Sequence, residues 1–138
     1  MALSNKDVQI LQHMIKYCQQ IKSTMLYFRI TKDLLDNSFM IQNAISMPIL
    51  QIGELANHLS KDFTSTHSEI PWRDVVGMRN MFAHDYEKRD VETIWLTIKE
   101  DAPFLEQYCT KLLQREHQAV PVPEPAIKNK SDDRSPTR

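Results

Sequence analysis

An arginine and a histidine five residues apart are the pair in this sequence best suited to carry chemistry. Together with two neighbours they form the pattern R-N-x-x-x-H-x-Y, made by Arg79, Asn80, His84 and Tyr86. An Arg and a His at this spacing are expected about 0.25 times by chance in such a chain, but the added Tyr lowers the expectation to roughly 0.007. The full pattern therefore predicts a functional site.

These residue types suit the cleavage of RNA without a metal, in which the ribose 2′-OH attacks the adjacent phosphorus. Histidine side chains in general change charge near neutral pH, so His84 is a candidate to take or give a proton. Arg79 offers a planar fork of donors to the phosphoryl oxygens as charge builds up on them. Asn80 lies four residues before His84 on the same helix face and could orient the imidazole or the phosphate. DNA lacks the 2′-OH and should be refused.

The spacing of Arg79 and His84 creates a geometric difficulty within one chain. Five residues place the two side chains about 140° apart around an ideal helix. A symmetric dimer removes much of this difficulty, because two copies of the same helix can face each other and pool two Arg and two His in one cleft. In such a homodimer the active site would be composite, and the monomer would be inactive.

A purely structural role is the alternative for this cluster. Arg79 would then pair with a carboxylate, and His84 would only cap a helix C-terminus, where a cation opposes the helix dipole. Arg73, Lys88 and Arg89 flank the motif and are candidate contacts for RNA phosphates. Acidic residues are interleaved with them in the sequence, so solvated surface charge is an equally good interpretation of these three.

Metal chemistry has little support in the sequence. It contains no H-E-x-x-H pattern, no C-x-x-C pattern and no glycine-rich phosphate loop. The remaining histidines have no ligand spacing. Each is therefore expected on the surface or on a helix face: His13, His58, His67 and His117. We expect neither a metal site nor a cofactor.

Long helices joined by short links are the elements expected to position the motif. Only 2 Gly occur in 138 residues, whereas sheets and loop-rich folds use glycine in turns and bulges. Apolar residues make up 41% of the chain, which is enough for one core in one domain. The net charge of −1 supplies no broad basic field for nucleic acid, so an RNA site would have to be local. The predicted fold class is all-α, a four- to five-helix up-and-down bundle.

Two long helices are predicted in the first half of the chain. Ser4 and Asp7 resemble a capping box, and the apolar stripes behind them are wide enough for a helix that touches two neighbours. After a break near residues 29–31, a second helix is expected over residues 38–59. Pro48 should kink it, and Gly53 in mid-helix indicates that another backbone approaches closely there.

The second half is predicted to hold a loop, two more helices and a tail. Residues 60–69 are polar and typical of a loop, after which Pro71 suits the first turn of a third helix that runs to about residue 83. Asp90 is a good N-cap for the fourth helix, and Pro103 should kink or split that helix near Asp101. The bundle is expected to span residues 1–118, and the Pro- and charge-rich residues 119–138 to be disordered.

The cysteines and the apolar runs bear on where the protein works. Cys18 and Cys109 lie far apart without a partner pattern, so both are expected as reduced thiols in the core. The N-terminus has no apolar signal segment, and no uninterrupted apolar run approaches the ~20 residues that span a bilayer. We therefore expect a cytoplasmic protein.

The motif and its setting resemble the HEPN domain, specifically the HepT-like toxin ribonucleases of prokaryotic toxin–antitoxin pairs. The resemblance runs from about Ser4 to Leu113 and rests on R-N-x-x-x-H-x-Y on the third helix. It includes Gln51-Ile52-Gly53-Glu54-Leu55, Ile70-Pro71-Trp72, and the segment from Val91 to Leu105 with its Asp101-Ala102-Pro103 break. Many relatives have Gly-Glu-Ala where this chain has Gly-Glu-Leu, and many lack Pro48.

The resemblance implies a homodimer and a partner protein. In that family the antitoxin is a minimal nucleotidyltransferase that attaches AMP to a tyrosine at the position of Tyr86. Phosphate charge and bulk beside the cleft would repel or block RNA. Packing of the Tyr86 phenol against the other protomer is the structural alternative, because tyrosine is common at interfaces.

The leading prediction is thus a metal-independent endoribonuclease toxin that is neutralised by a nucleotidyltransferase antitoxin. A non-catalytic helical module that binds a nucleotide or a nucleotidyltransferase is the second hypothesis, and a plain oligomeric scaffold is the third. A neighbouring gene for a small nucleotidyltransferase with a G-S-x(10)-D-x-D pattern would favour the first.

Overall fold

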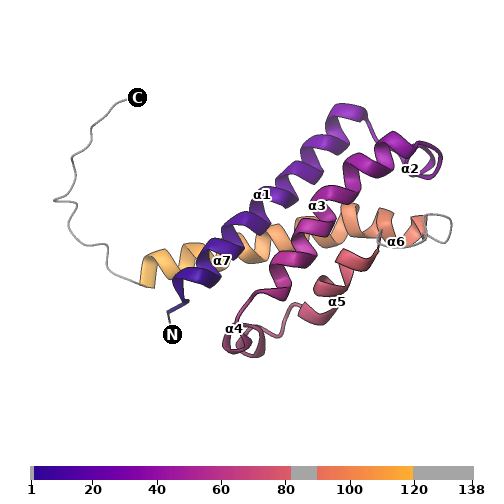
Figure 1. The fold of residues 1–138 in the computed structure, drawn as a ribbon. Coiled ribbons are helices and arrows are strands. Elements are labelled where there is room, and N and C mark those ends of the chain that lie inside the picture. Colours follow the sequence, from indigo (N-terminus) through magenta and orange to yellow (C-terminus); the bar gives the residue numbers. More distant parts are fainter. Residues whose placement is uncertain (1, 82–89, 120–138) are drawn as a thin grey trace, which may run out of the picture.

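The computed structural model describes residues 2–81 and 90–119. Within these ranges the chain forms α1 (Asn5–Phe28), α2 (Lys32–Asn37), α3 (Phe39–Asn57), α4 (Lys61–Thr66), α5 (Trp72–Gly77), the 3₁₀ turn η1 (Met78–Asn80), α6 (Val91–Leu96), the π-helical turn η3 (Thr97–Asp101) and α7 (Ala102–Ala119). Successive long elements run in opposite directions, with the short helices α2 and α4 in connections at opposite ends (Figure 1). The predicted all-α up-and-down bundle is confirmed.

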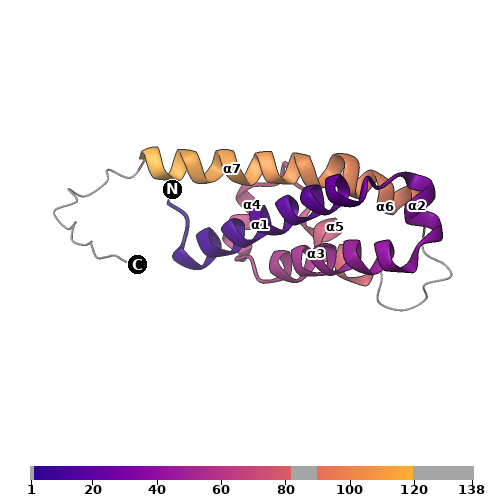
Figure 2. The same ribbon diagram turned by 90° about the horizontal axis from the view of Figure 1, so that it is seen from above.

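Helix α1 lies between its two main neighbours. It packs against α3 on one side and α7 on the other, and the view in Figure 2 shows α1 between these two helices. Its two apolar stripes explain this position, because one helix face can satisfy only one neighbour. The buried positions of α1 come from both stripes: Ile10, Leu11, Met14, Cys18 and Ile21.

The ends of the first long helices agree with the sequence patterns. Ser4 caps α1 by accepting from the backbone N of Asp7, and α1 ends at Arg29, whose φ of 50° is left-handed. Ser38 caps α3, which continues through Pro48. The expected kink at Pro48 stays a prediction. The short helix α2, between Arg29 and Ser38, was not predicted; the Thr31 side chain caps its N-terminus.

The prediction of a loop over residues 60–69 is wrong, because α4 occupies Lys61–Thr66. The Ser60 side chain caps this helix at the backbone N of Phe63, and the Phe63 side chain is buried. One buried aromatic residue anchors an otherwise polar turn, whose sequence shows no helical periodicity over so short a length. His67 ends the helix and stacks on Phe63 with 4.2 Å between the ring centroids.

The capping-box prediction for α1 is half right. Ser4 makes its part of the motif, but the Asp7 carboxylate accepts hydrogen bonds from the backbone N of Ser60 at 3.0 Å and from Ser60 Oγ at 2.7 Å. Asp7 is only 3% exposed and therefore links α1 to the start of α4. Burial raises the pKa of Asp7, but the hydrogen bonds of Ser60 and Ser4 and the charge of Lys6 together outweigh this and leave it below its usual value.

The fourth long element is split where Pro103 predicts. Asp90 caps α6 by accepting from the backbone N of Glu92 at 3.0 Å. The helix then widens into the π-helical turn η3 and resumes as α7 at Ala102. Pro103 has no N–H to donate into the preceding turn, and its ring crowds the carbonyl there, so the wider turn absorbs the mismatch. Helix α7 ends at Ala119, the first residue of the predicted tail; the rest of that tail, residues 120–138, lies outside the described residues.

Both cysteines lie in the core as free thiols, as predicted. Burial raises the pKa of each to about 12. A thiol held this far from its ordinary pKa is a packing residue and a poor nucleophile. Within the described ranges, no helix is both long enough and apolar enough to cross a membrane.

Candidate functional site

Arg79 lies in the 3₁₀ turn η1, directly after α5, so the third predicted helix tightens before it reaches the arginine. Trp72 fixes the start of α5: its ring is buried, and its Nε1 donates to the carbonyl oxygen of His67 at 2.8 Å. Val75 is buried one turn later. These two side chains hold α5 against the core and thereby set where the following turn can lie.

The turn η1 lies against α3 at Gly53. A Cβ at Gly53 would be 2.6 Å from the backbone N of Arg79 and 3.2 Å from its Cα. Both are backbone atoms, which cannot move aside as the end of a flexible side chain can. The close backbone approach predicted at this glycine is therefore confirmed, and the backbone that approaches is that of Arg79.

The Arg79 side chain forms an ion pair with α3. Its Nη1 donates to Glu54 Oε1 at 2.9 Å. The two side chains are 38% and 52% exposed, so the pair lies at the surface. The pairing of Arg79 with a carboxylate is what the structural alternative expects. It occupies one nitrogen of the guanidinium, whose fork carries five N–H donors, and the exposed remainder can meet a ligand.

The structure describes only part of the predicted site. Asn80 is exposed at the end of η1, and Met81 is partly buried against the core. His84 and Tyr86 lie outside the described residues, as do Lys88 and Arg89, so their roles and the expected approach of Arg79 to His84 stay predictions.

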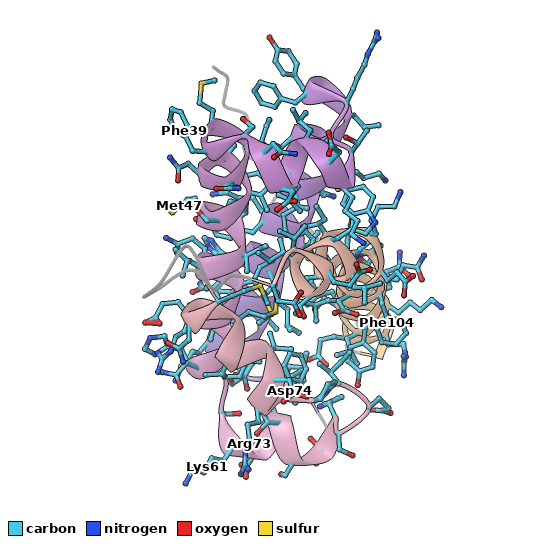
Figure 3. The ribbon with its side chains drawn as sticks, turned by 90° about the vertical axis from the view of Figure 1, so that its right-hand side faces the viewer. Phe39, Met47, Lys61, Arg73, Asp74 and Phe104 are labelled. Carbon is cyan, nitrogen blue, oxygen red and sulfur yellow. The ribbon has the colours of Figure 1, made fainter. Side chains whose placement is uncertain are left out.

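Arg73 lies near the start of α5 and is exposed. In Figure 3 both Arg73 and Lys61 lie at the α4 end of the molecule. Asp74 follows it directly in the sequence. Arg73 is thus available to an RNA phosphate, and its charge is equally available to solvent.

A cavity of about 280 Å³ lies behind η1, between α5 and the η3–α7 element. Met78 and Met81 line one side, and the polar part of its wall includes Asp74 and Asp101. Burial raises the pKa of Asp101, and the nearby Glu100 carboxylate raises it further. Apolar and acidic walls do not suit a phosphate group.

The described histidines do not form a metal centre. No group of three or more His, Cys, Asp or Glu in residues 2–81 and 90–119 is arranged to hold an ion. His13, His58 and His117 are exposed, and the half-buried His67 caps α4, so all four lie where the sequence predicts.

Sequence reasoning assigned no role to Glu54. Glu54 belongs to the segment Gln51-Ile52-Gly53-Glu54-Leu55, in which only Gly53 was predicted to have a structural role. A signal was present, because the residue after a glycine that admits another backbone lies close to that backbone too. Which segment approached could not be read from the sequence.

Comparison with known proteins relates the chain to a family of ribonucleases. The family described as "Ribonuclease HepT-like" matches residues 14–112. "Putative RNase TTE0752" of Caldanaerobacter subterraneus is 38% identical over 65 residues, covering 47% of this chain and 58% of that protein. "Probable ribonuclease HepT" of Thermococcus cleftensis is 39% identical over 71 residues, covering 51% and 64%. Both matches span less than two thirds of the relative.

A third relative matches over more of its length. "Putative RNase MJ1380" of Methanocaldococcus jannaschii is 30% identical over 105 residues, which are 73% of this chain and 92% of that protein. No solved structure gives a significant match. A helical bundle whose Arg-Asn turn follows α5 and packs against α3, together with these matches, defines the class: the chain belongs to the HepT-like ribonuclease family.

Proposed function

We propose that this chain is a metal-independent endoribonuclease toxin, active as a homodimer and neutralised by a cognate nucleotidyltransferase that attaches AMP to Tyr86. The observation that carries the proposal is the placement of Arg79. Its backbone is fixed against Gly53 while its side chain remains 38% exposed, five residues before His84 in a chain of a ribonuclease family. An arginine with a fixed backbone and an accessible head suits a phosphate-binding role.

The proposed reaction needs no co-reactant. The ribose 2′-OH loses its proton to a base and attacks phosphorus; the bond from phosphorus to the 5′ oxygen breaks, and that oxygen takes up a proton. The products are a 2′,3′-cyclic phosphate and a 5′-hydroxyl. His84 moves the protons, Arg79 stabilises the charge on the phosphoryl oxygens, and Asn80 orients the imidazole or the phosphate.

A surface on α3 supports the homodimer. Met40, Met47 and Glu54 are seven residues apart, so they lie along nearly one line of the helix. Met40 and Met47 are 67% and 55% exposed, and Phe39 next to them is 69% exposed. Figure 3 shows Phe39 and Met47 pointing away from the bundle on the same side. A second copy on this line would cover the apolar side chains and bring two Arg79 turns near one cleft.

The partner is proposed from the family resemblance, and the RNA contacts are proposed from the positions of basic residues beside the motif. AMP on Tyr86, two residues beyond His84, would add negative charge beside the cleft and repel RNA. Arg73, Lys88 and Arg89 are proposed to hold RNA phosphates on either side of the cut. Coexpression with the nucleotidyltransferase should add the mass of one AMP to the peptide that contains Tyr86.

The test is cleavage of total tRNA and of a plain single-stranded RNA in EDTA. The wild type should cut and leave cyclic-phosphate ends, whereas Arg79→Ala and His84→Ala should lose at least about 100-fold in rate. Arg115→Ala, which removes an exposed arginine on α7, is the matched control and should cut like the wild type.

Two results would contradict the proposal. If a folded dimer free of AMP cuts neither RNA, the chain is better explained as a non-catalytic module that binds a nucleotide or a nucleotidyltransferase. If cutting persists in both variants, Arg79 and His84 are not its catalytic residues.

A further inference from the structure

Two adjacent residues of α3 hold Arg79 from different sides. Gly53 leaves room for the Arg79 backbone, and Glu54 accepts a hydrogen bond from the Arg79 guanidinium at 2.9 Å. The rest of η1 is a single 3₁₀ turn that ends at Asn80, so it cannot by itself fix a long side chain. From this pair of contacts we infer that Glu54 is a positioning residue, which aims Arg79 at the phosphate; the inference rests on the proposed function.

The exposure of the pair argues against a role in folding. Both side chains are well exposed, and surface ion pairs of this kind contribute little to stability. Holding the guanidinium in one orientation is a different effect. An unrestrained arginine side chain loses rotational freedom about several bonds when it binds a phosphate. An arginine already held by a carboxylate has lost most of this freedom beforehand. The gain therefore appears in the reaction rate.

The geometry leaves part of the guanidinium available. One donor, on Nη1, is used by Glu54, and the planar group carries others on Nη2 and Nε. A carboxylate on one edge fixes the plane of the group, so the donors on its other edges keep a set direction. Glu54 does not touch the reacting atoms in this arrangement and acts only through Arg79.

The negative charge of Glu54 should weaken RNA binding, whereas its positioning of Arg79 should speed the reaction. A carboxylate beside a phosphate site repels RNA, so its removal should weaken catalysis while leaving RNA binding as tight or tighter. This opposition separates positioning from a general loss of structure, which would weaken both kcat and binding.

The experiment measures kcat and KM for Glu54→Ala and Glu54→Gln with the full-length protein. Glu54→Ala should lower kcat about 10- to 100-fold, with KM unchanged or lower. Glu54→Gln keeps an oxygen that accepts from Arg79, so it should recover most of the lost kcat. Glu92→Ala is the matched control: it removes the other described surface ion pair, between Lys32 and Glu92, and should leave both constants unchanged.

A second readout is independent of cleavage. In ¹⁵N-labelled protein the Arg79 Nε–Hε signal, assigned by its loss in Arg79→Lys, should report a restricted side chain in the wild type and in Glu92→Ala. In Glu54→Ala it should report a mobile one, while the circular dichroism spectrum stays that of the folded helices.

The outcomes keep the two proposals apart. If Glu54→Ala retains wild-type kcat, or if its Arg79 signal is unchanged, the positioning role is overturned even when the wild type cuts RNA. If the wild type cuts no RNA, the proposed function fails, and the Arg79 signal alone then decides whether Glu54 holds the arginine.

Discussion

Arg79 owes its position to a residue that has no side chain. Gly53 is buried in α3, where a glycine costs roughly 1 kcal/mol relative to alanine. The cost is offset by contact with the Arg79 backbone, which any larger residue would push away. Gly77, in contrast, has open space where its Cβ would be, although it lies only two residues before Arg79.

The two glycines therefore make a matched pair of substitutions. Gly53→Ala should displace the η1 turn, lower the free energy of unfolding by about 1–3 kcal/mol and reduce RNA cleavage more than that loss explains. Gly77→Ala should fold normally and change stability by less than about 1 kcal/mol. Urea unfolding and single-turnover cleavage measure both effects; equal behaviour of the two variants would refute the role assigned to Gly53.

Polar contacts between helices connect residues that are far apart in the sequence, so the local sequence of each helix does not predict them. Asp7 belongs to α1 by position, yet its carboxylate serves Ser60, which itself caps α4. This arrangement stabilises the short helix α4, and α4 in turn presents Phe63 to the Trp72 ring at 5.5 Å between centroids. The start of α5, and with it the Arg79 turn, depends on this chain of contacts.

Asp7→Asn should destabilise the protein at neutral pH. The amide keeps one acceptor for two donors from Ser60, so we expect a loss of about 1–3 kcal/mol in the free energy of unfolding at pH 7. The exposed Asp36→Asn should change it by less than about 0.5 kcal/mol and serves as the control.

The effect of Asp7 should depend on pH in a defined direction. Its pKa in the folded protein lies below the usual 3.8, so its contribution is complete above that value and is lost as the pH falls through the folded pKa. The difference between wild type and Asp7→Asn should thus shrink in urea titrations at pH 3 and below. A difference that is constant with pH would contradict a role for the ionised carboxylate.

At the scale of the whole molecule, the bundle leaves several large apolar side chains in solvent. Phe39, Met40 and Met47 gather along α3, whereas Phe104, at 56% exposed, lies on α7 at the opposite side in Figure 3. The α3 group continues toward Glu54 and Arg79, and Phe104 does not share a helix with either. Of these two sites, the α3 group is therefore the one expected to form the interface between protomers.

A charge placed at each position distinguishes them. Met47→Glu should convert the dimer to a folded monomer in analytical ultracentrifugation and abolish RNA cleavage, because a charge buried at an interface without a partner is costly. Phe104→Glu should remain dimeric and active. Should the Met47→Glu protein stay dimeric while Phe104→Glu dissociates, the protomers meet through α7 instead.

The sequence by itself determined the helical class, the long helices, the caps at Ser4 and Asp90, and the break before Pro103. These features depend on local forces, namely apolar periodicity, side chains that satisfy free N–H groups, and a residue that lacks one. It also indicated Arg79 and Asn80 as candidate site residues and a close backbone approach at Gly53. Helices α2 and α4 were not predicted from the sequence, because six residues are too few to show a helical period.

Tertiary structure alone decided which groups from distant positions meet. Three such contacts join residues 25 or more apart in the chain. The Asp7 carboxylate accepts hydrogen bonds from Ser60, the Arg79 backbone packs on Gly53, and Glu54 holds the Arg79 guanidinium. Such contacts depend on how α1, α3 and α5 pack around a shared core, and no local pattern encodes that packing.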